Sequence, residues 1–241
     1  MKSTSETGHA INVANFNNLI TSVMALGAMY APSKAELKLA SLNAISASAT
    51  NSIDEVMKKR NAYNNAVNAR LLGFSKMRPL TTRLLAALYI TDANFELLKD
   101  AKTINRKIQG KRALAIEPVA EGEVAPKSIS ASQVSYSQLI QHFTTLVNLI
   151  ETVSSYQPTE NDLKLDTLQT YITELNSLHS EVSTAYISIG NTRMERNQIL
   201  YKPLVGLINI ALSVKLYVKS VFGAKSPEYK GINKIPFRTI A

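Results

Sequence analysis

Apolar residues recur at alternating three- and four-residue intervals along two long stretches of this 241-residue chain. This spacing places them along one side of an α-helix. No proline interrupts either stretch, so each predicts one helix of about 40 residues, or about 60 Å. The first stripe consists of Leu42, Ser46, Ala49, Ile53, Val56, Arg60, Tyr63, Val67, Arg70 and Phe74, and the second of Leu168, Ile172, Leu175, His179, Val182, Tyr186, Ile189, Arg193, Arg196 and Leu200.

Shorter helical patterns precede and follow each long helix. We predict helices at residues 11–29 and 135–155 before them, and at 79–109 and 203–222 after them, with a break near Thr91. Pro79 and Pro203 suit a first helical turn, where the N–H that proline lacks would have no helical partner. Gly223 is a predicted C-cap, and Ser226 precedes one further short helix.

Residues 30–42 recur at residues 156–168 with a constant offset of 126, which predicts a tandem duplication. Both segments begin with Tyr-x-Pro and a hydroxyl residue, continue to Leu-Lys-Leu and end in leucine. Ser33 stands three positions before Glu36, and Thr159 three before Asp162. Each pair predicts a capping box, which marks the start of a helix.

These patterns predict an all-α fold, an elongated helical bundle made of two tandem repeats with pseudo-twofold symmetry. In each repeat a short helix precedes the long helix and another helix follows it. The predicted repeats comprise residues 1–112 and 133–241. Residues 113–132 contain Pro118, Gly122 and Pro126 without periodicity and are predicted to form a linker, which lets the repeats pack as one bundle.

Composition narrows the class of protein further. The chain has no cysteine, which excludes disulfides and thiolate chemistry. The polar N-terminus lacks the features of a secretory signal, and the longest apolar stretch, residues 204–214, is too short to span a membrane. We therefore expect a cytoplasmic protein without a transmembrane segment. The net charge of +9 suits an acidic partner such as nucleic acid, an anionic membrane surface or an acidic protein face, and it equally fits lysines scattered over a solvated surface.

No pattern of catalytic, cofactor-binding or metal-ligating residues stands out. The three histidines, His9, His142 and His179, lack metal-ligand spacing, and the nine glycines form no phosphate-binding loop. We expect a non-enzymatic protein without a cofactor.

Four arginines occupy the apolar stripes, where an unpaired guanidinium would be unfavourable. Arg60, Arg70, Arg193 and Arg196 are therefore expected either to extend to the rim of the helix or to form ion pairs that set helix register, with carboxylates such as Glu195 or Asp100 as partners. The alternative is an anion site.

Further basic residues gather in short segments and are candidates for contact with an anion or a partner. They are Lys58, Lys59, Arg106, Lys107, Lys111, Arg112, Lys219, Lys225, Lys230 and Lys234. The start of the second long helix is acidic by contrast, with Glu160, Asp162, Asp166 and Glu174. This polarity suits self-association, and the basic segments equally suit a nucleic-acid backbone.

Residues 217–223, followed by 226–230 and Ile232, resemble the ending of a family of uncharacterised bacterial helical proteins. That resemblance implies a soluble helical fold and no activity. Taken together, the residues favour a helical scaffold that binds itself or another protein. The alternative is a nucleic-acid-associated protein that contacts the phosphate backbone through basic helix ends.

Overall fold

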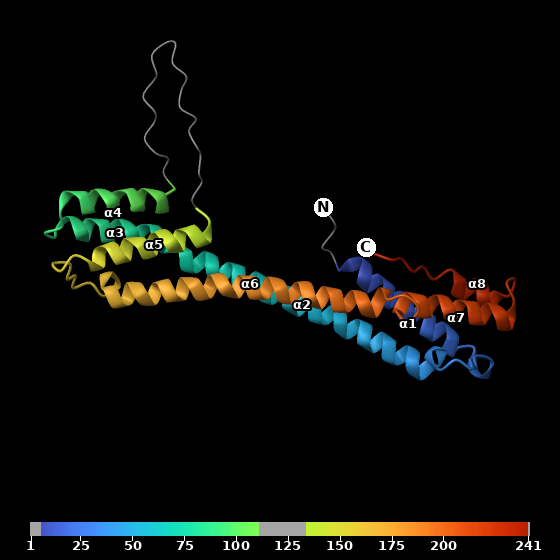
Figure 1. Cartoon of the computed structure of the whole chain (residues 1–241). Helices are drawn as coiled ribbons and strands as arrows, with labels where there is room; N and C mark the ends of the chain where they lie inside the picture. Colours follow the sequence, from blue (N-terminus) through green and yellow to red (C-terminus); the bar gives the residue numbers. More distant parts are fainter. Residues whose placement is uncertain (1–5, 111–133, 241) are drawn as a thin grey trace, which may run out of the picture. The chain divides into compact units, whose positions relative to one another are not determined.

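The computed structural model describes residues 6–110 and 134–240, and these residues are helical without any strand (Figure 1). The all-α prediction is therefore confirmed for the described chain. The α-helices are α1 (Thr7–Met24), α2 (Leu39–Ser75), α3 (Met77–Tyr89), α4 (Phe95–Ile108), α5 (Tyr136–Glu151), α6 (Leu165–Tyr201), α7 (Leu207–Phe222) and α8 (Pro227–Asn233). Three short 3₁₀-helices, η1 (Gly27–Met29), η2 (Ala35–Leu37) and η3 (Asn161–Leu163), lie between them.

The chain forms two compact units. Unit 1 consists of Met1–Tyr63 and Ala185–Ala241, and unit 2 of Asn64–Thr184. These units cut across the predicted repeats, because unit 1 holds the beginning of α2 and the end of α6 while unit 2 holds the remainder of both helices. The predicted linker, residues 113–132, lies outside the described residues.

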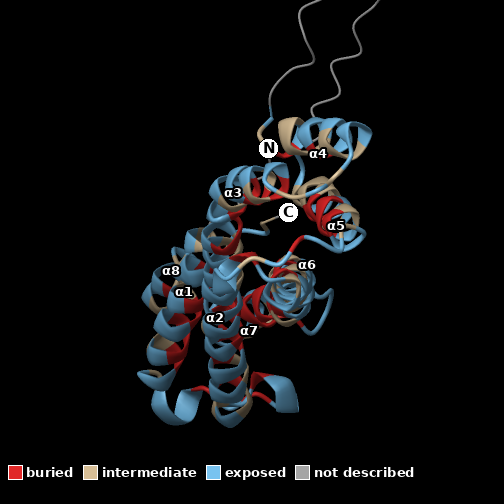
Figure 2. Ribbon diagram, turned by 90° about the vertical axis from the view of Figure 1, so that its left-hand side faces the viewer, coloured by how far each residue is buried: buried red, intermediate tan, exposed pale blue. Residues whose placement is uncertain are grey.

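Unit 1 is built around α7, which packs against α1 and α8. Phe16 and Leu19 of α1 are fully buried in its core, together with Leu207 and Val214 of α7. In Figure 2 the buried positions lie along one side of the helices and leave the other sides exposed. This arrangement is what amphipathic helices around a shared core produce.

Unit 2 is built around α4, which packs against both α3 and α5, and Figure 1 shows these three helices side by side. Leu84 of α3, Ile108 of α4 and Phe143 of α5 are fully buried in its core. Within this unit α6 also meets the end of α2, because the Tyr171 hydroxyl donates to the carbonyl oxygen of Gly73 at 2.7 Å. The two units therefore have separate apolar cores.

Both long helices contain 37 residues, close to the predicted length. Most positions of the two stripes are buried or half-buried, which confirms the periodicity on which they were predicted. Arg60 and Tyr186 are the exposed exceptions.

The segments that lead into the long helices differ from the prediction. Ser33 and Thr159 form no cap, so the capping-box interpretation is wrong, and a 3₁₀ turn precedes each α-helix. A buried tyrosine closes both turns instead. The Tyr30 hydroxyl donates to Leu37 O at 2.7 Å, and the Tyr156 hydroxyl donates to Leu163 O at 2.9 Å. Burial raises the pKa of each tyrosine to about 12.

Replacing Tyr30 or Tyr156 by phenylalanine should lower the free energy of unfolding by about 1–2 kcal/mol each, because a buried carbonyl group loses its donor. The two losses should add, since the residues lie in different units and share no partner. Urea denaturation measures both. Tyr229→Phe is the control, because its hydroxyl makes only an exposed 3.5 Å bond to Asn233. Losses no larger than that of the control would contradict this account of the turns.

The remaining helix ends follow local signals. The predicted break near Thr91 is confirmed, because α3 ends at Tyr89 and the Asn94 side chain caps α4 by accepting from Leu97 N. Ser226 caps α8 in the same way. The prediction failed at Pro203, because α7 begins only at Leu207 after a tight turn.

Candidate interaction surfaces

The C-terminal segment of unit 1 is held by buried polar side chains. Asn12 of α1 donates to Arg238 O at 2.7 Å and accepts from Arg238 N at 3.1 Å. Lys215 of α7 donates to Asn233 O at 3.1 Å and Ile235 O at 2.6 Å. Burial lowers the pKa of Lys215. These contacts give Asn12 and Lys215 a structural role, because they hold the C-terminal segment against α1 and α7.

Arg196 is 4% exposed, and its guanidinium pairs with Glu6 and with the side-chain oxygen of Asn197. Arg193 contributes a second, longer contact with Glu6 at 3.8 Å. The partner carboxylate therefore comes from the N-terminal end of α1, and not from the expected Glu195 or Asp100.

His9 lies beside this ion pair. Its Nδ1 is 2.6 Å from the Tyr201 hydroxyl, which also accepts from Asn12 Nδ2 at 3.3 Å. Burial lowers the pKa of His9, and the positive charge of Arg196 adds to the effect. A neutral histidine that accepts a hydrogen bond from the tyrosine hydroxyl fits this site. The cluster therefore serves as a polar contact that joins α1 to α6.

Arg70 is placed in unit 2. Its Nη1 donates to His179 Nδ1 at 3.4 Å, and its guanidinium carbon lies 4.0 Å from the ring centroid of Tyr136. Because arginine can only donate, the other nitrogen of His179, Nε2, is the one that donates to Ser137 Oγ, at 3.0 Å. This cation–π stack connects α2, α5 and α6. Among the described residues, two buried side-chain nitrogens lack a hydrogen-bond partner, Arg70 Nε and His142 Nε2.

Arg60 lines an open cleft of about 660 Å³ between α1 and α2 of unit 1. The cleft wall combines apolar side chains, such as Val13 and Met57, with Glu6 and Asp54. A smaller cleft of about 390 Å³ lies between α1 and the C-terminal segment. Neither wall contains a histidine.

The predicted basic residues fall in both units. Lys58, Lys59, Lys219, Lys225, Lys230 and Lys234 are exposed in unit 1, Arg106 and Lys107 belong to unit 2, and Lys111 and Arg112 lie outside the described residues. Lys58 pairs with Glu55 at 2.7 Å, which leaves it less available to a partner. Unit 1 contains fifteen Lys and Arg against six Asp and Glu, whereas unit 2 contains twelve of each. The whole net charge of +9 therefore belongs to unit 1.

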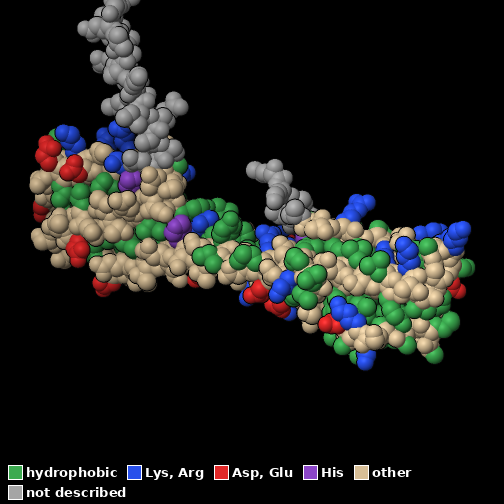
Figure 3. Space-filling model, turned by 45° about the vertical axis from the view of Figure 1, so that its right-hand side comes forward, with side chains coloured by type: hydrophobic (Ala, Val, Ile, Leu, Met, Phe, Trp, Pro, Cys, Tyr) green, Lys and Arg blue, Asp and Glu red, His purple; other side chains and the backbone are tan. Residues whose placement is uncertain are grey.

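The outer side of α7 carries apolar residues that nothing in the described structure covers. Leu212 and Leu216 lie one turn apart on this side, and Leu216 is 64% exposed. Leu204 and Val205 extend the surface into the preceding turn. We call these four residues the α7 face. Figure 3 shows apolar side chains among basic ones on unit 1.

Leu204 is held in a strained backbone conformation. Its φ is 69°, and it is the only non-glycine residue with positive φ in the described chain. Left-handed geometry costs about 1–2 kcal/mol for a residue with a side chain. The turn is tight, since a Cβ on Gly206 would lie 2.6 Å from Lys202 N. The strained turn thus presents a leucine that is 81% exposed.

Unit 2 has its own exposed apolar residues, where α3 ends and α4 begins. Ile90 is 88% exposed and Phe95 75% exposed, and Tyr89 is partly exposed beside them. The loop after α5 lies against this connection, because Asp92 N donates to Ser155 Oγ at 3.2 Å. We call residues 89–96 and 151–166 the unit 2 tip.

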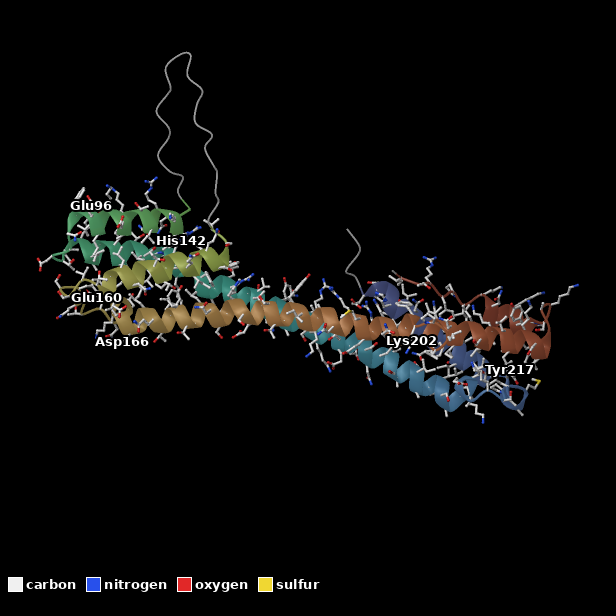
Figure 4. The ribbon with its side chains drawn as sticks, in the orientation of Figure 1. Glu96, His142, Glu160, Asp166, Lys202 and Tyr217 are labelled. Atoms are coloured by element: carbon white, nitrogen blue, oxygen red, sulfur yellow. The ribbon has the colours of Figure 1, made fainter. Side chains whose placement is uncertain are left out.

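The unit 2 tip is acidic, with six carboxylates and one lysine. Figure 4 shows Glu96, Glu160 and Asp166 at this same end of unit 2. Asp162 pairs with Arg83, and Glu96 lies 3.6 Å from Lys99. The other four carboxylates, Asp92, Glu151, Glu160 and Asp166, take part in none of the ion pairs found among the described residues. The tip therefore presents negative charge around Ile90 and Phe95.

Sequence reasoning found the basic segments but missed both apolar surfaces. Most of residues 207–222 are apolar, more than one buried side of a helix requires, which is a signal that some of them stay uncovered. Ile90 and Phe95 flank the predicted break near Thr91, and nothing local distinguishes them from core residues.

In the described part of the chain, no group of histidine and acidic side chains is arranged to hold a metal ion. None of the helices there has the length and apolar character needed to cross a membrane. Comparison of the chain with models of protein families, with curated proteins and with solved structures finds no match.

Proposed function

We propose that this protein is a non-enzymatic helical scaffold that assembles with further copies of itself. The observation that carries the proposal is the α7 face, four exposed apolar residues of α7 and of the turn that precedes it. Contiguous exposed apolar residues on a folded protein mark sites of interaction. The strained turn at Leu204 supports the proposal, since strain of this kind gathers at functional positions.

We also propose that the chain arose by duplication. Five buried residues of α1 correspond to buried residues of α5 at an offset of 127, after which the two tyrosine turns follow at 126. The five pairs are Val13 and Ile140, Phe16 and Phe143, Leu19 and Leu146, Ile20 and Val147, and Val23 and Ile150. Duplication supports a scaffold, because it supplies two related units whose surfaces can diverge into complementary partners.

Light scattering on nuclease-treated protein over a concentration series tests assembly. We expect a mass above the 26.4 kDa of one chain, and we expect it to rise with concentration. Leu212→Ser with Leu216→Ser should return the protein to a monomer, whereas Ile187→Ser, at an exposed position of α6, should not. A wild-type monomer at every concentration would contradict self-assembly.

Leu204→Gly separates assembly from stability. Glycine adopts positive φ freely, so strain of about 1–2 kcal/mol is relieved. The greater chain entropy of unfolded glycine offsets about 0.5–1 kcal/mol of this gain. The free energy of unfolding should therefore rise slightly while assembly weakens. A fall in stability together with unchanged assembly would remove Leu204 from the proposed surface.

The location of the net charge favours one second candidate, a protein that binds the nucleic-acid backbone through unit 1. Lys219, however, lies 5.9 Å from the ring centroid of Tyr229, and Tyr217 packs edge-on against Tyr30. These aromatic rings are occupied within unit 1 and do not form a free platform for stacking bases. Binding to DNA or RNA that falls steeply with added salt would support this candidate.

A further inference from the structure

We propose that the α7 face of unit 1 binds the unit 2 tip of a second copy of this chain. The inference rests on the proposed self-assembly and names the two surfaces that meet. Each copy would present one face and one tip, so one copy can bind a second through its face and a third through its tip.

Both surfaces have the composition of an interface centre. Leu204 and Leu216 are exposed apolar anchors on the α7 face, and Ile90 and Phe95 are exposed apolar anchors on the tip. Protein interfaces commonly have an apolar centre surrounded by a polar rim. The two anchors of the tip are strongly exposed where α3 connects to α4, whereas the α7 face consists of the side of a helix and the turn before it. Two exposed apolar side chains of this kind can pack on such a surface.

Charge selects the tip as the partner of the α7 face. No carboxylate occurs between Arg196 and Glu228, while Lys202, Lys219 and Lys225 are exposed in that segment. The tip is acidic, so its contact with this segment brings opposite charges together at the rim. Such complementarity steers association and selects partners.

The same charges oppose the symmetric alternatives. Two α7 faces in contact would bring lysines against lysines, and two tips would bring carboxylates against carboxylates. Juxtaposed like charges disfavour an interface. The contact is therefore heterologous, and repeated heterologous contacts produce closed rings or open filaments whose mass grows with concentration.

Complementation between two variants of the full-length chain tests this pairing. The face variant carries Leu212→Ser and Leu216→Ser, and the tip variant carries Ile90→Ser and Phe95→Ser. All four positions are exposed, so both variants should remain folded, which circular dichroism checks. Each variant alone should have the mass of one chain. An equimolar mixture should form a dimer and nothing larger, because it contains one intact face and one intact tip. Added salt should weaken that dimer.

The outcomes separate this pairing from self-assembly in general. If the wild-type protein assembles and the tip variant assembles equally well, the pairing is wrong although self-assembly stands. If both variants are monomers and their mixture stays monomeric, the pairing is equally wrong. A wild-type protein that stays monomeric overturns self-assembly itself. Ile187→Ser is the matched control and should assemble like the wild type.

Discussion

Replacing Glu6 by alanine should destabilise unit 1 by about 3–5 kcal/mol, as expected when one partner of a buried ion pair is removed. Arg196 is then left buried with only the Asn197 side-chain oxygen as its partner. The loss of the contact between Arg193 and Glu6 contributes much less to this destabilisation, because Arg193 is more exposed and lies further from Glu6. Urea denaturation followed by circular dichroism measures the loss.

Two controls distinguish lost charge from lost shape at this site. Glu6→Gln keeps a hydrogen-bond acceptor, so its loss should be smaller than that of Glu6→Ala. The double variant Glu6→Leu with Arg196→Leu removes both charges and should recover much of the stability, since apolar replacement of a buried pair is often neutral. A loss below about 1 kcal/mol for Glu6→Ala would show that water reaches Arg196 and that the pair contributes as little as a surface one.

Local patterns predicted the helices well because a helix is a local structure. The interval between apolar residues located α2 and α6, and the residue types around Ser226 located the start of α8. The capping boxes failed because Ser33 and Thr159 have the right neighbours but stand before a 3₁₀ turn. A tyrosine closes that turn from seven residues before the carbonyl group, which lies outside any capping pattern.

The partners of the stripe arginines could not be found in this way. Glu6 lies 190 residues from Arg196 in the sequence, and periodicity along one helix carries no information about such contacts. The two short helices were predicted as equivalent, but the residue-by-residue match between α1 and α5 was missed. The loop after α1 is one residue longer than the loop after α5, so the offset there is 127 instead of 126.

The proposed surfaces depend on which apolar residues remain uncovered, and that is a property of the fold. Leu212 and Leu216 look in the sequence like core residues of α7, and the structure shows that α1 and α8 cover its other sides. The separation of charge between the two units also depends on the fold. It becomes clear only when residues 185–241 are joined with residues 1–63 into unit 1.

Phe16→Ala and Phe143→Ala should each lower the stability of one core by about 3–5 kcal/mol, because each ring is fully buried and its removal leaves a cavity. The two positions correspond in the proposed duplication, and they belong to different cores. If each core opens separately, the loss of stability should be confined to the unit that carries the substitution, since cooperative segments can unfold locally.

Amide hydrogen exchange locates the loss. Phe16→Ala should speed amide exchange in α1 and α7, and Phe143→Ala should speed it in α4 and α5. Exchange in α2 and α6 should rise in both variants, because these helices contribute residues to both cores. Phe95→Ala is the control, as its exposed ring contributes nothing to either core. Equal acceleration in all helices for both core variants would show that the chain unfolds as one unit. In that case the continuous helices α2 and α6 would couple the two cores more strongly than their separate packing indicates.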